Sequence, residues 1–278
     1  MIKIAFIGAG NMARAIIIGL VKSGVAPQSI MVANPSSQKR LALAEDFGVQ
    51  QTNDNIAAAE FANVIVLSVK PHFISDVCQQ IATAHVNKVI DIKDKTFISV
   101  AAGTTVAQIQ QALNGNYPVI RVMPNTPSQV GLGMSGLFAS AEVSDAEKAV
   151  SEKLMNAVGK SIWLQTEAQI DDIIAVAGSA PAYFFLFMEA MEKQAQQLGF
   201  NAQESRMLVE QTALGAAQMV AQNNIPISQL RENVTSKGGT TQAALKQFTD
   251  DGLETLVANA MNAAIMRAKE MAKLEPRN

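Results

Sequence analysis

The chain has 278 residues, of which 49% are hydrophobic, and its formal net charge at pH 7 is -2. That length suits one large domain or two of ordinary size, and the apolar content is enough for complete cores. A charge so close to zero, without a basic cluster, gives no attraction to nucleic acid or to an anionic membrane surface. We therefore expect neither of these as a partner.

The scarcity of cysteine and histidine argues against disulfides and metal sites. Cys78 is the single cysteine, and His72 and His85 are the two histidines. On a helix, His72 and Cys78 would fall on different faces, which does not suit a shared metal ion. We interpret all three as structural and expect no metal. The unpaired cysteine, and a start at Met1 that enters an apolar stretch without a secretory leader, predict a cytoplasmic protein.

The segment that organises the chain is residues 2–22. Residues 2–7 are typical of a buried parallel strand and residues 15–21 of a helix packed against it. Between them lies a G-x-G-x-x-G/A fingerprint made of Gly8, Ala9, Gly10, Asn11, Met12 and Ala13. Gly8 would permit the tight turn and Gly10 the approach of backbone to a pyrophosphate, with the helix N-terminus facing the phosphates. An ordinary structural turn is the alternative, but the strand-turn-helix context favours a dinucleotide site.

The end of the next predicted strand, residues 30–33, indicates which dinucleotide binds. NAD sites usually carry Asp or Glu there for the ribose 2′-hydroxyl, whereas this chain has Asn34. Nearby donors suited to a 2′-phosphate are Ser36, Ser37, Lys39 and Arg40. The pattern favours NADPH, with NADH as the alternative cofactor. In the other interpretation, Lys39 and Arg40 are part of a solvated helix turn.

Further strands are predicted at residues 64–68, 97–103 and 119–123, the last followed by a rigid turn at 124–127. The first of these ends in Ser68, Val69, Lys70 and Pro71, and the second in the small residues Ala101, Ala102 and Gly103. Ligands of open α/β sheets bind at the carboxyl ends of strands, so Lys70 is a candidate cofactor or substrate contact. Strands alternating with helices predict a doubly wound, Rossmann-type dinucleotide-binding domain over residues 1–164.

From residue 165 onward the pattern becomes helical. Helices are predicted from Ala182, over 201–223 and over 253–274, which makes residues 165–278 an all-α domain. The first of these is apolar nearly all round, so it must be covered on several sides, and a homodimer is the natural way to cover it. The longest apolar stretch, residues 173–191, is interrupted by glycine, proline and glutamate, which disfavours a membrane span.

One polar, glycine-bearing segment, residues 230–245, interrupts this helical domain. Gly238 and Gly239 would let several backbone N–H groups converge, with hydroxyls from Ser236, Thr240 and Thr241 around them. That suits a small anion such as a carboxylate. A plain helix N-cap with Thr240 as the capping residue fits equally well, so the residues alone leave both interpretations open.

Five motifs together resemble the pyrroline-5-carboxylate reductase family over essentially the whole chain. They are residues 8–13 (GAGNMA), 68–71 (SVKP), 122–127 (VMPNTP), 178–183 (GSAPAY) and, most specific, 234–241 (VTSKGGTT). One departure is Ala180, where the family usually has glycine. The family reduces 1-pyrroline-5-carboxylate to L-proline with NAD(P)H, the last step of proline biosynthesis. The resemblance implies a Rossmann domain followed by a helical domain that interlocks in a homodimer, and such dimers often assemble into rings.

The resemblance also implies roles for individual residues. Gly8 to Ala13 should hold the pyrophosphate, with Asn34, Ser36 and Asn55 around the adenosine ribose and its phosphate. Ser68 to Pro71 and Ala101 to Gly103 should line the nicotinamide. The residues expected to receive the substrate are Asn233, Ser236, Gly238, Gly239, Thr240 and Thr241.

We expect direct hydride transfer from the nicotinamide to C5 of the imine, with Ser236, Thr240 and Thr241 as catalytic residues. Either the substrate binds already protonated, or a Thr240 or Thr241 hydroxyl passes a proton to the ring nitrogen. A 3-hydroxyacid dehydrogenase of the 6-phosphogluconate type is the competing enzyme class, but residues 173–186 lack the catalytic lysine that its resemblance calls for. A further alternative is a non-enzymatic sensor of NADP(H) redox state, but that function would not explain the polar loop at residues 236–241.

Overall fold

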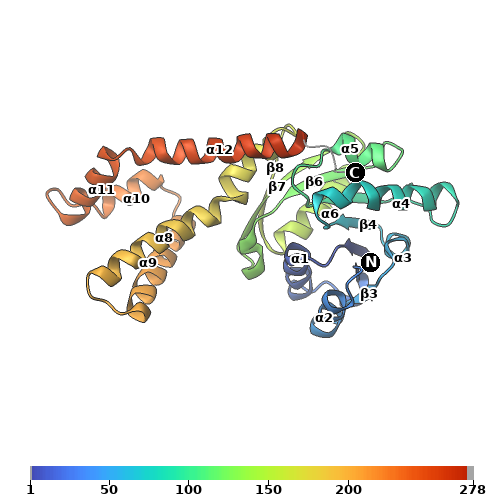
Figure 1. The fold of residues 1–278 in the computed structure, drawn as a ribbon, viewed down its shortest axis with the longest axis horizontal. Coiled ribbons are helices and arrows are strands. Elements are labelled where there is room, and N and C mark those ends of the chain that lie inside the picture. The colour runs from blue at the N-terminus through green and yellow to red at the C-terminus, as the bar shows by residue number, and fades with distance from the viewer. Residues whose placement is uncertain (1, 274–278) are drawn as a thin grey trace. The chain divides into compact units, whose positions relative to one another are not determined.

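The computed structural model describes residues 2–273, with side chains up to residue 270. The chain forms two compact units (Figure 1). The first runs to Ser179 and includes the last part of the final helix from Ala264 on; the second is Ala180–Ala263. This division differs from the boundary expected at 164/165. Residues 165–179 belong to the first unit because they pack on its sheet, where Ile173 fills the space beside Gly136.

The first unit contains an eight-stranded sheet in the order β3-β2-β1-β4-β5-β6-β7-β8. Pairing is parallel from β3 through to β6, antiparallel between β6 and β7, and parallel between β7 and β8. The strands are β1 Ile4–Ile7, β2 Ile30–Ala33, β3 Gln50–Thr52, β4 Val64–Leu67, β5 Thr96–Ser99, β6 Val119–Met123, β7 Gly133–Ala139 and β8 Gly159–Trp163. The doubly wound α/β class is confirmed, and the antiparallel β7 is an addition that the sequence pattern did not specify.

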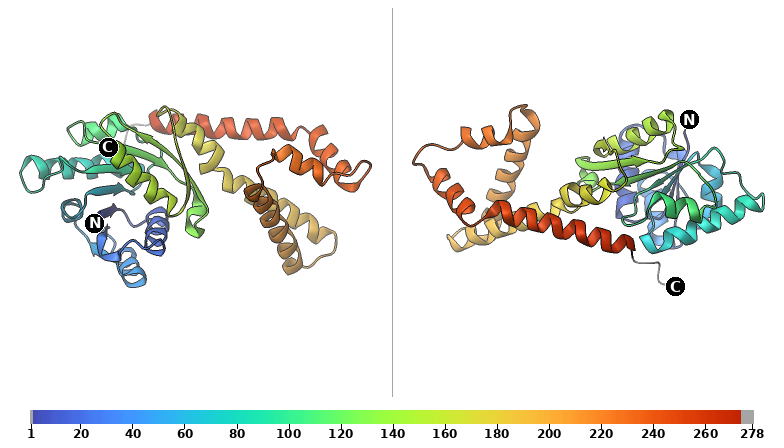
Figure 2. Two further views of the ribbon diagram at one scale, coloured as in Figure 1. Left: turned by 180° about the vertical axis from the view of Figure 1, so that it is seen from behind. Right: turned by 90° about the horizontal axis from the view of Figure 1, so that it is seen from above.

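Helices cover both faces of this sheet, as Figure 2 shows. Alternate side chains of one strand therefore enter different cores: Ala5 and Ile7 lie in one apolar cluster, and Ile4 and Phe6 in the other. This burial on both faces explains why the parallel strands are apolar without interruption. The helices of the first unit are α1 Asn11–Lys22, α2 Ser37–Phe47, α3 Asn55–Phe61, α4 Ile74–Val86, α5 Val106–Ala112, α6 Asp145–Asn156 and α7 Gln169–Ile173.

Local capping fixes where several of these helices begin and end. Thr105 with Gln108 forms a capping box at the start of α5, and Ser144 with Glu147 forms one at the start of α6. Gly48 ends α2 in the left-handed conformation, with a φ of 70°. Each of these caps involves residues within a few positions of the helix end, so the sequence pattern is sufficient to locate these helices.

The second unit is helical, as predicted. Its elements are α8 Ala180–Gln197, α9 Ala202–Gln222, α10 Ile227–Asn233, α11 Thr240–Asp250 and the larger part of α12 Leu253–Lys273. Leu274, the predicted end of the last helix, lies outside the described residues. Phe187 of α8 and Phe248 of α11 pack with their ring centroids 5.9 Å apart.

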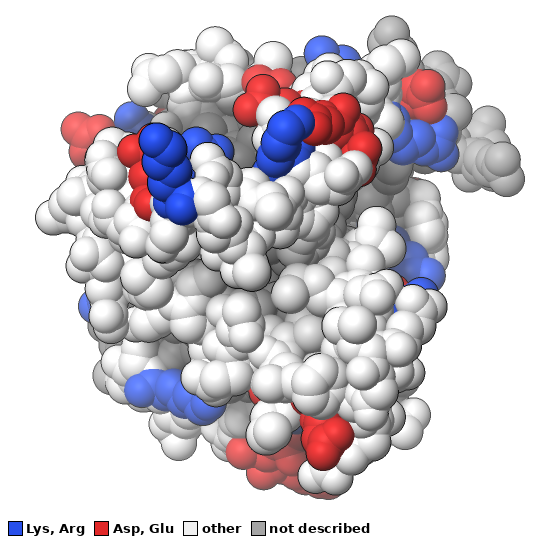
Figure 3. Space-filling view, turned by 90° about the vertical axis from the view of Figure 1, so that its left-hand side faces the viewer, with Lys and Arg blue, Asp and Glu red and all other residues white. Residues whose placement is uncertain are grey.

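Many large apolar side chains of the second unit are exposed in the single chain. Phe184, Phe185 and Leu186 of α8 are each more than 60% exposed. On the face drawn in Figure 3 the Lys, Arg, Asp and Glu side chains lie mainly toward the margins, leaving an uncharged middle. The helical stretch Gln169–Gln197 is also long and apolar enough to cross a membrane by length and composition. The small and polar residues expected to interrupt this stretch lie where the helix is irregular, because Ser179 forms a bend directly before α8.

Candidate functional site

The turn from β1 into α1 has the geometry that the fingerprint predicts. Gly8 has a φ of 111°, and a Cβ added to it would lie 2.6 Å from the backbone C and O of Ser68. Only glycine fits there, because of both the conformation and the space. Gly10 is the N-cap of α1, which has neither a side-chain cap nor an acidic residue in its first turn. The first N–H groups of α1 are thus available to an anion.

Asn34, directly after β2, is hydrogen-bonded to this turn. Its Oδ1 accepts from the N–H of Ala9 at 3.2 Å, and its Nδ2 donates to the carbonyl of Ser36 at 3.2 Å. Ser36 in turn is the exposed N-cap of α2, which also lacks an acidic first turn. Asn34 therefore joins the predicted pyrophosphate turn to the predicted ribose-phosphate end.

The other predicted ribose contacts differ in their surroundings. Arg40 donates from Nη1 to Gln51 of β3, so its guanidinium already has a partner within the first unit. Lys39 is exposed beside the start of α2 and stays a candidate donor. Asn55 donates to Gln80 of α4 at 3.2 Å, and its place near the ribose stays a prediction.

The predicted nicotinamide side lies along the carboxyl ends of β4 and β5. The Ser68 hydroxyl donates to the carbonyl oxygens of Gly8, at 2.9 Å, and Ile7, at 3.1 Å. Lys70 is exposed and precedes the short 3-10 helix Pro71–Phe73. After β5 the N–H of Val100 donates to the Leu67 carbonyl at 3.1 Å, and Gly103 turns the chain with a φ of 76°. Among the predicted residues of the first unit, Gly8, Ala9, Asn34, Ser36 and Ser68 are thus linked by hydrogen bonds.

The predicted substrate loop lies between α10 and α11 in the second unit. Gly239, not Thr240, is the N-cap of α11, and no side chain caps this helix. The interpretation of Thr240 as a capping residue is therefore wrong: Thr240 is the first residue of the helix. Gly238 adopts a φ of 74°, and the N–H of Gly239 donates to Ser236 at 3.0 Å. Asn233, Ser236, Thr240 and Thr241 are exposed in the single chain.

Gln242 is a residue of this loop that the sequence reasoning missed. Its Oε1 accepts from the N–H of Gly238 at 2.6 Å, which holds the glycine turn against the first turn of α11. The N-cap Gly239 has no side chain and Gln242 accepts from the residue before it, so the Ser/Thr-x-x-Gln spacing of a capping box does not mark this contact. The N–H groups of Thr240 and Thr241 have no intrahelical acceptor and point toward solvent or a ligand.

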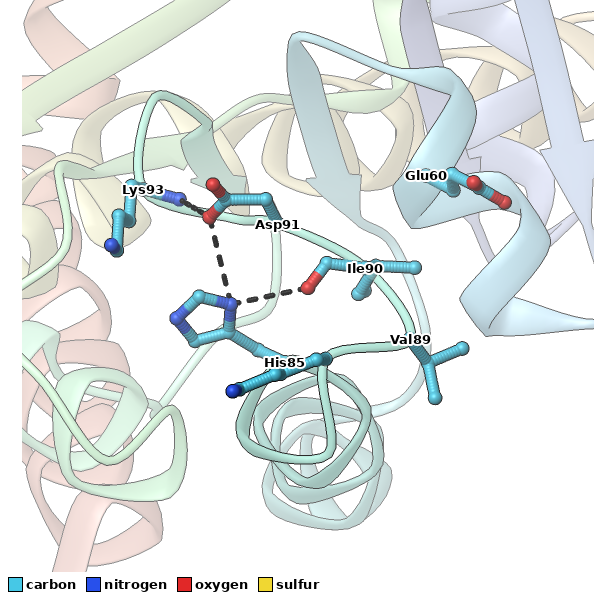
Figure 4. A pocket seen from close by; sticks show the side chains of 7 residues that line it. Glu60, His85, Val89, Ile90, Asp91 and Lys93 are labelled. Atoms are coloured by element: carbon cyan, nitrogen blue, oxygen red, sulfur yellow. Dashed lines mark hydrogen bonds and ion pairs between the residues drawn. The ribbon is translucent and has the colours of Figure 1, made fainter.

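Cys78 and His85 of the first unit lie away from the dinucleotide turn and have structural roles. Cys78 is buried, and burial raises its pKa to about 12. His85 lines a cavity of about 420 Å³ between the end of α4 and the start of β5 (Figure 4). There its Nδ1 lies 3.2 Å from the Ile90 carbonyl oxygen and 3.6 Å from an Asp91 oxygen. The cavity lies at the amino ends of the strands, the edge opposite to the dinucleotide turn.

Within residues 2–270 no group of three His, Cys, Asp or Glu side chains is arranged to hold a metal ion. Lys95 lies behind the same loop, where its Nζ donates to the carbonyls of Glu60 and Ala62. Its pKa is lowered by burial. This lysine therefore serves the backbone of the loop between α3 and β4.

Comparisons with known proteins agree on one family. The family model for pyrroline-5-carboxylate reductase dimerisation matches residues 167–271, and a model described as NADP oxidoreductase, coenzyme F420-dependent, matches residues 3–103. The chain is 53% identical to a pyrroline-5-carboxylate reductase of Vibrio alginolyticus over 98% of both chains.

Solved structures give the same result over the full length. A pyrroline-5-carboxylate reductase from Coxiella burnetii superposes with a TM-score of 0.92 at 43% identity, covering 98% of this chain and 99% of that one. The Plasmodium falciparum pyrroline carboxylate reductase with NADP bound has a TM-score of 0.85 at 26% identity, covering 98% of each chain. A reductive aminase from Aspergillus terreus, 16% identical with a TM-score of 0.54, shares the fold alone.

Proposed function

The chain belongs to the pyrroline-5-carboxylate reductase family, and from this premise we propose how its residues reduce the C=N bond of 1-pyrroline-5-carboxylate to L-proline with NADPH. The observation that carries the proposal is the contact between Gly8 and the Ser68 backbone, which brings the dinucleotide turn to the carboxyl end of β4. The activity places the enzyme at the last step of proline biosynthesis.

The cofactor would lie along the carboxyl edge of the sheet. The turn Gly8 to Ala13 would bind the pyrophosphate through the N–H groups after Ala9, because the start of α1 carries no acidic side chain. The N–H groups of Gly8 and Ala9 are already donated to the Ala33 carbonyl and to Asn34. Asn34, Ser36 and Asn55 would surround the ribose and its 2′-phosphate, while Ser68 to Pro71 and Ala101 to Gly103 would line the nicotinamide. Asn34 offers no carboxylate to repel the 2′-phosphate, which supports NADPH over NADH. When bound, this cofactor supplies the hydride that C5 of the imine accepts.

The substrate carboxylate would bind at the start of α11. The N–H groups of Thr240 and Thr241 lie there with the positive end of the helix dipole, and the hydroxyl of Ser236 is close by in the chain. Gln242 would keep the turn at Gly238 ready for this anion, since it already holds the N–H of that glycine. Asn233 would complete the rim of the site from the end of α10.

Protonation of the ring nitrogen would make C5 more electrophilic. A hydroxyl of Thr240 or Thr241 would pass a proton to that nitrogen, unless the imine binds in its protonated form. Threonine is a weak acid, so most of the rate would come from the alignment of the ring with the nicotinamide.

The active form would be a homodimer of a soluble, cytoplasmic protein. The apolar side chains exposed on α8 call for a cover, and the dimerisation model spans residues 167–271. A second copy accounts for them better than a membrane or nucleic acid, given the net charge of -2. Dimers would associate further into a ring, which size-exclusion chromatography with light scattering would test.

One assay separates this function from its competitors. Purified protein with NADPH is mixed with 1-pyrroline-5-carboxylate or with a 3-oxoacid, and absorbance at the nicotinamide band is followed. The proposal expects NADPH consumption with the imine alone, and L-proline as the product. Consumption with the 3-oxoacid alone would support the dehydrogenase class, and consumption with neither would support the sensor.

A further inference from the structure

A π-helical turn, Ile174–Gly178, follows α7 directly and leads through Ser179 into α8. Within it the N–H of Ser179 donates to the carbonyl of Ile174 at 2.7 Å, a bond that spans five residues instead of four. A π turn holds one residue more than an α turn, so its loss would rotate every following side chain by about 100° about the helix axis. Such turns are rare and persist where neighbouring groups stabilise them.

Asn125, the second residue after the end of β6, contacts this π turn. Its Nδ2 donates to the carbonyl of Ala177 at 3.1 Å, and its Oδ1 accepts from the N–H of Met134 in β7 at 2.9 Å. The side chain is buried, with 7% of the residue exposed. The amide orientation is determined by its partners, because a carbonyl only accepts and an N–H only donates. An aspartate in this place would direct an oxygen at the Ala177 carbonyl.

Space around the π turn is limited on the same side. A Cβ added to Gly178 would lie 2.9 Å from Cε of Met123, the last residue of β6. The tip of β6 therefore contacts the π turn twice, through the amide of Asn125 and through the side chain of Met123. This tip lies at the carboxyl edge of the sheet, two strands from the end of β4 that meets the dinucleotide turn.

We propose that Asn125 is a positioning residue for hydride transfer. It holds the π turn in register, so that the backbone at Gly178 keeps its place beside the tip of β6 at the carboxyl edge of the sheet. The inference rests on the proposed function. Asn125 contacts neither cofactor nor substrate in this account. It acts through the carbonyl of Ala177, and its loss would misalign the reacting groups while leaving the pyrophosphate turn intact.

The decisive variant is Asn125→Asp, which keeps the shape and the acceptor for Met134 but removes the donor to Ala177. Enzyme saturated with NADPH is mixed with excess 1-pyrroline-5-carboxylate in a stopped-flow instrument, and one turnover is recorded. The expected result is a rate constant lower by about 100-fold, since misplacement by about 1 Å costs that much. The amplitude and the Kd for NADPH should stay within about twofold of wild type. Inactive or unfolded protein would instead lower the amplitude.

The control is Asn63→Asp, the same substitution at an exposed position. It also keeps the side-chain oxygen that accepts from the N–H of Lys3, and it should leave the rate constant unchanged. Should Asn125→Asp fail to fold, Asn125→Ala removes the donor to Ala177 without adding a charge, and its single-turnover rate constant is measured in the same way. A rate constant within threefold of wild type in folded Asn125→Asp, or in folded Asn125→Ala where the aspartate variant does not fold, would overturn the inference. If the wild type itself leaves the imine unreduced, the proposed function fails instead.

Discussion

Arg121 of β6 and Glu167, which precedes α7, form an ion pair with 2.8 Å between Nη1 and Oε1. The Arg121 side chain is only 6% exposed, whereas that of Glu167 is 30% exposed. The same Glu167 oxygen accepts from the N–H of Val106 at the start of α5, at 2.7 Å. One carboxylate thus joins β6, α5 and the segment between β8 and α7.

The unequal burial of this pair predicts an unequal response to substitution. Glu167→Ala leaves a buried guanidinium without its nearest partner and should lower the free energy of unfolding by about 3 kcal/mol. Arg121→Met leaves a carboxylate that is partly solvated and still bonded to Val106, and should cost about 1 kcal/mol. Urea denaturation measures both. The control is Glu189, which forms an exposed ion pair with Lys193. Glu189→Ala should change the free energy of unfolding by less than about 0.5 kcal/mol. Equal costs at 121 and 167 would contradict the argument.

Gly8→Ala should weaken NADPH binding. The new methyl would meet the Ser68 backbone at 2.6 Å, so the turn must open and its N–H groups must move away from the pyrophosphate. We expect the Kd for NADPH to rise by at least about tenfold, measured by isothermal titration. Gly24→Ala is the matched control, because Gly24 has a φ of 91° but nothing within 4 Å of the added carbon. It should cost about 1 kcal/mol of stability and leave the Kd unchanged. Similar Kd values for both variants would show that the close approach is unimportant.

The sequence pattern predicted the turn at Gly8 but gave no sign of the contact that Asn125 makes, and the difference lies in how far apart in sequence the interacting residues are. Glycine spacing, apolar strands and capping residues act over a few residues. The pattern therefore predicted the glycine turn after β1, the strands β1, β2, β4, β5 and β6, and the helical second unit. The hydrogen bond from Asn125 to Ala177 joins positions 52 apart, and no local signal marks it. β7 was missed for a related reason: its Gly133 and Gly136 are required by close neighbours, Ser128 and Ile173, and not by a strand preference.

Thr241→Ala tests the assignment of chemistry to the start of α11. If the hydroxyl takes part in protonation, kcat should fall by about 10-fold or more, with a smaller rise in KM for the imine. The backbone N–H groups that would bind the carboxylate remain, which is why KM should change less. Thr249→Ala, on the same helix with its hydroxyl donated to the Leu245 carbonyl, is the control. An unchanged kcat for Thr241→Ala would remove this threonine from the chemistry.

Cys78 should be inert toward thiol reagents in the folded protein. Burial raises its pKa to about 12, so the reactive thiolate is scarce at pH 8 and the sulfur is also shielded. Labelling with an aromatic disulfide should be slow until the protein unfolds, and then should reach one thiol per chain. Fast labelling of native protein, with activity retained, would contradict the burial.

Asp171→Asn should stabilise the protein at neutral pH. The pKa of Asp171 is raised, chiefly by burial in α7, and the attraction of Arg121 and Lys269 does not offset this. A carboxyl with a raised pKa in the folded state favours folding when protonated. That contribution is full below the unfolded pKa, near 3.8, and is lost as the pH rises through the folded value.

At pH 7 the wild type therefore folds with a disfavoured charge, which asparagine lacks. Its Tm should rise by about 1 °C at pH 7 relative to wild type, because Asp171 is only partly buried and solvent screens much of the penalty. The difference should shrink steadily toward pH 3.5. Calorimetry across this range measures the difference, and Asp94→Asn, at an exposed loop position, is the control. A variant that is less stable than wild type at pH 7 would mean that the charge of Asp171 is needed by Arg121 and Lys269 more than it is penalised by burial.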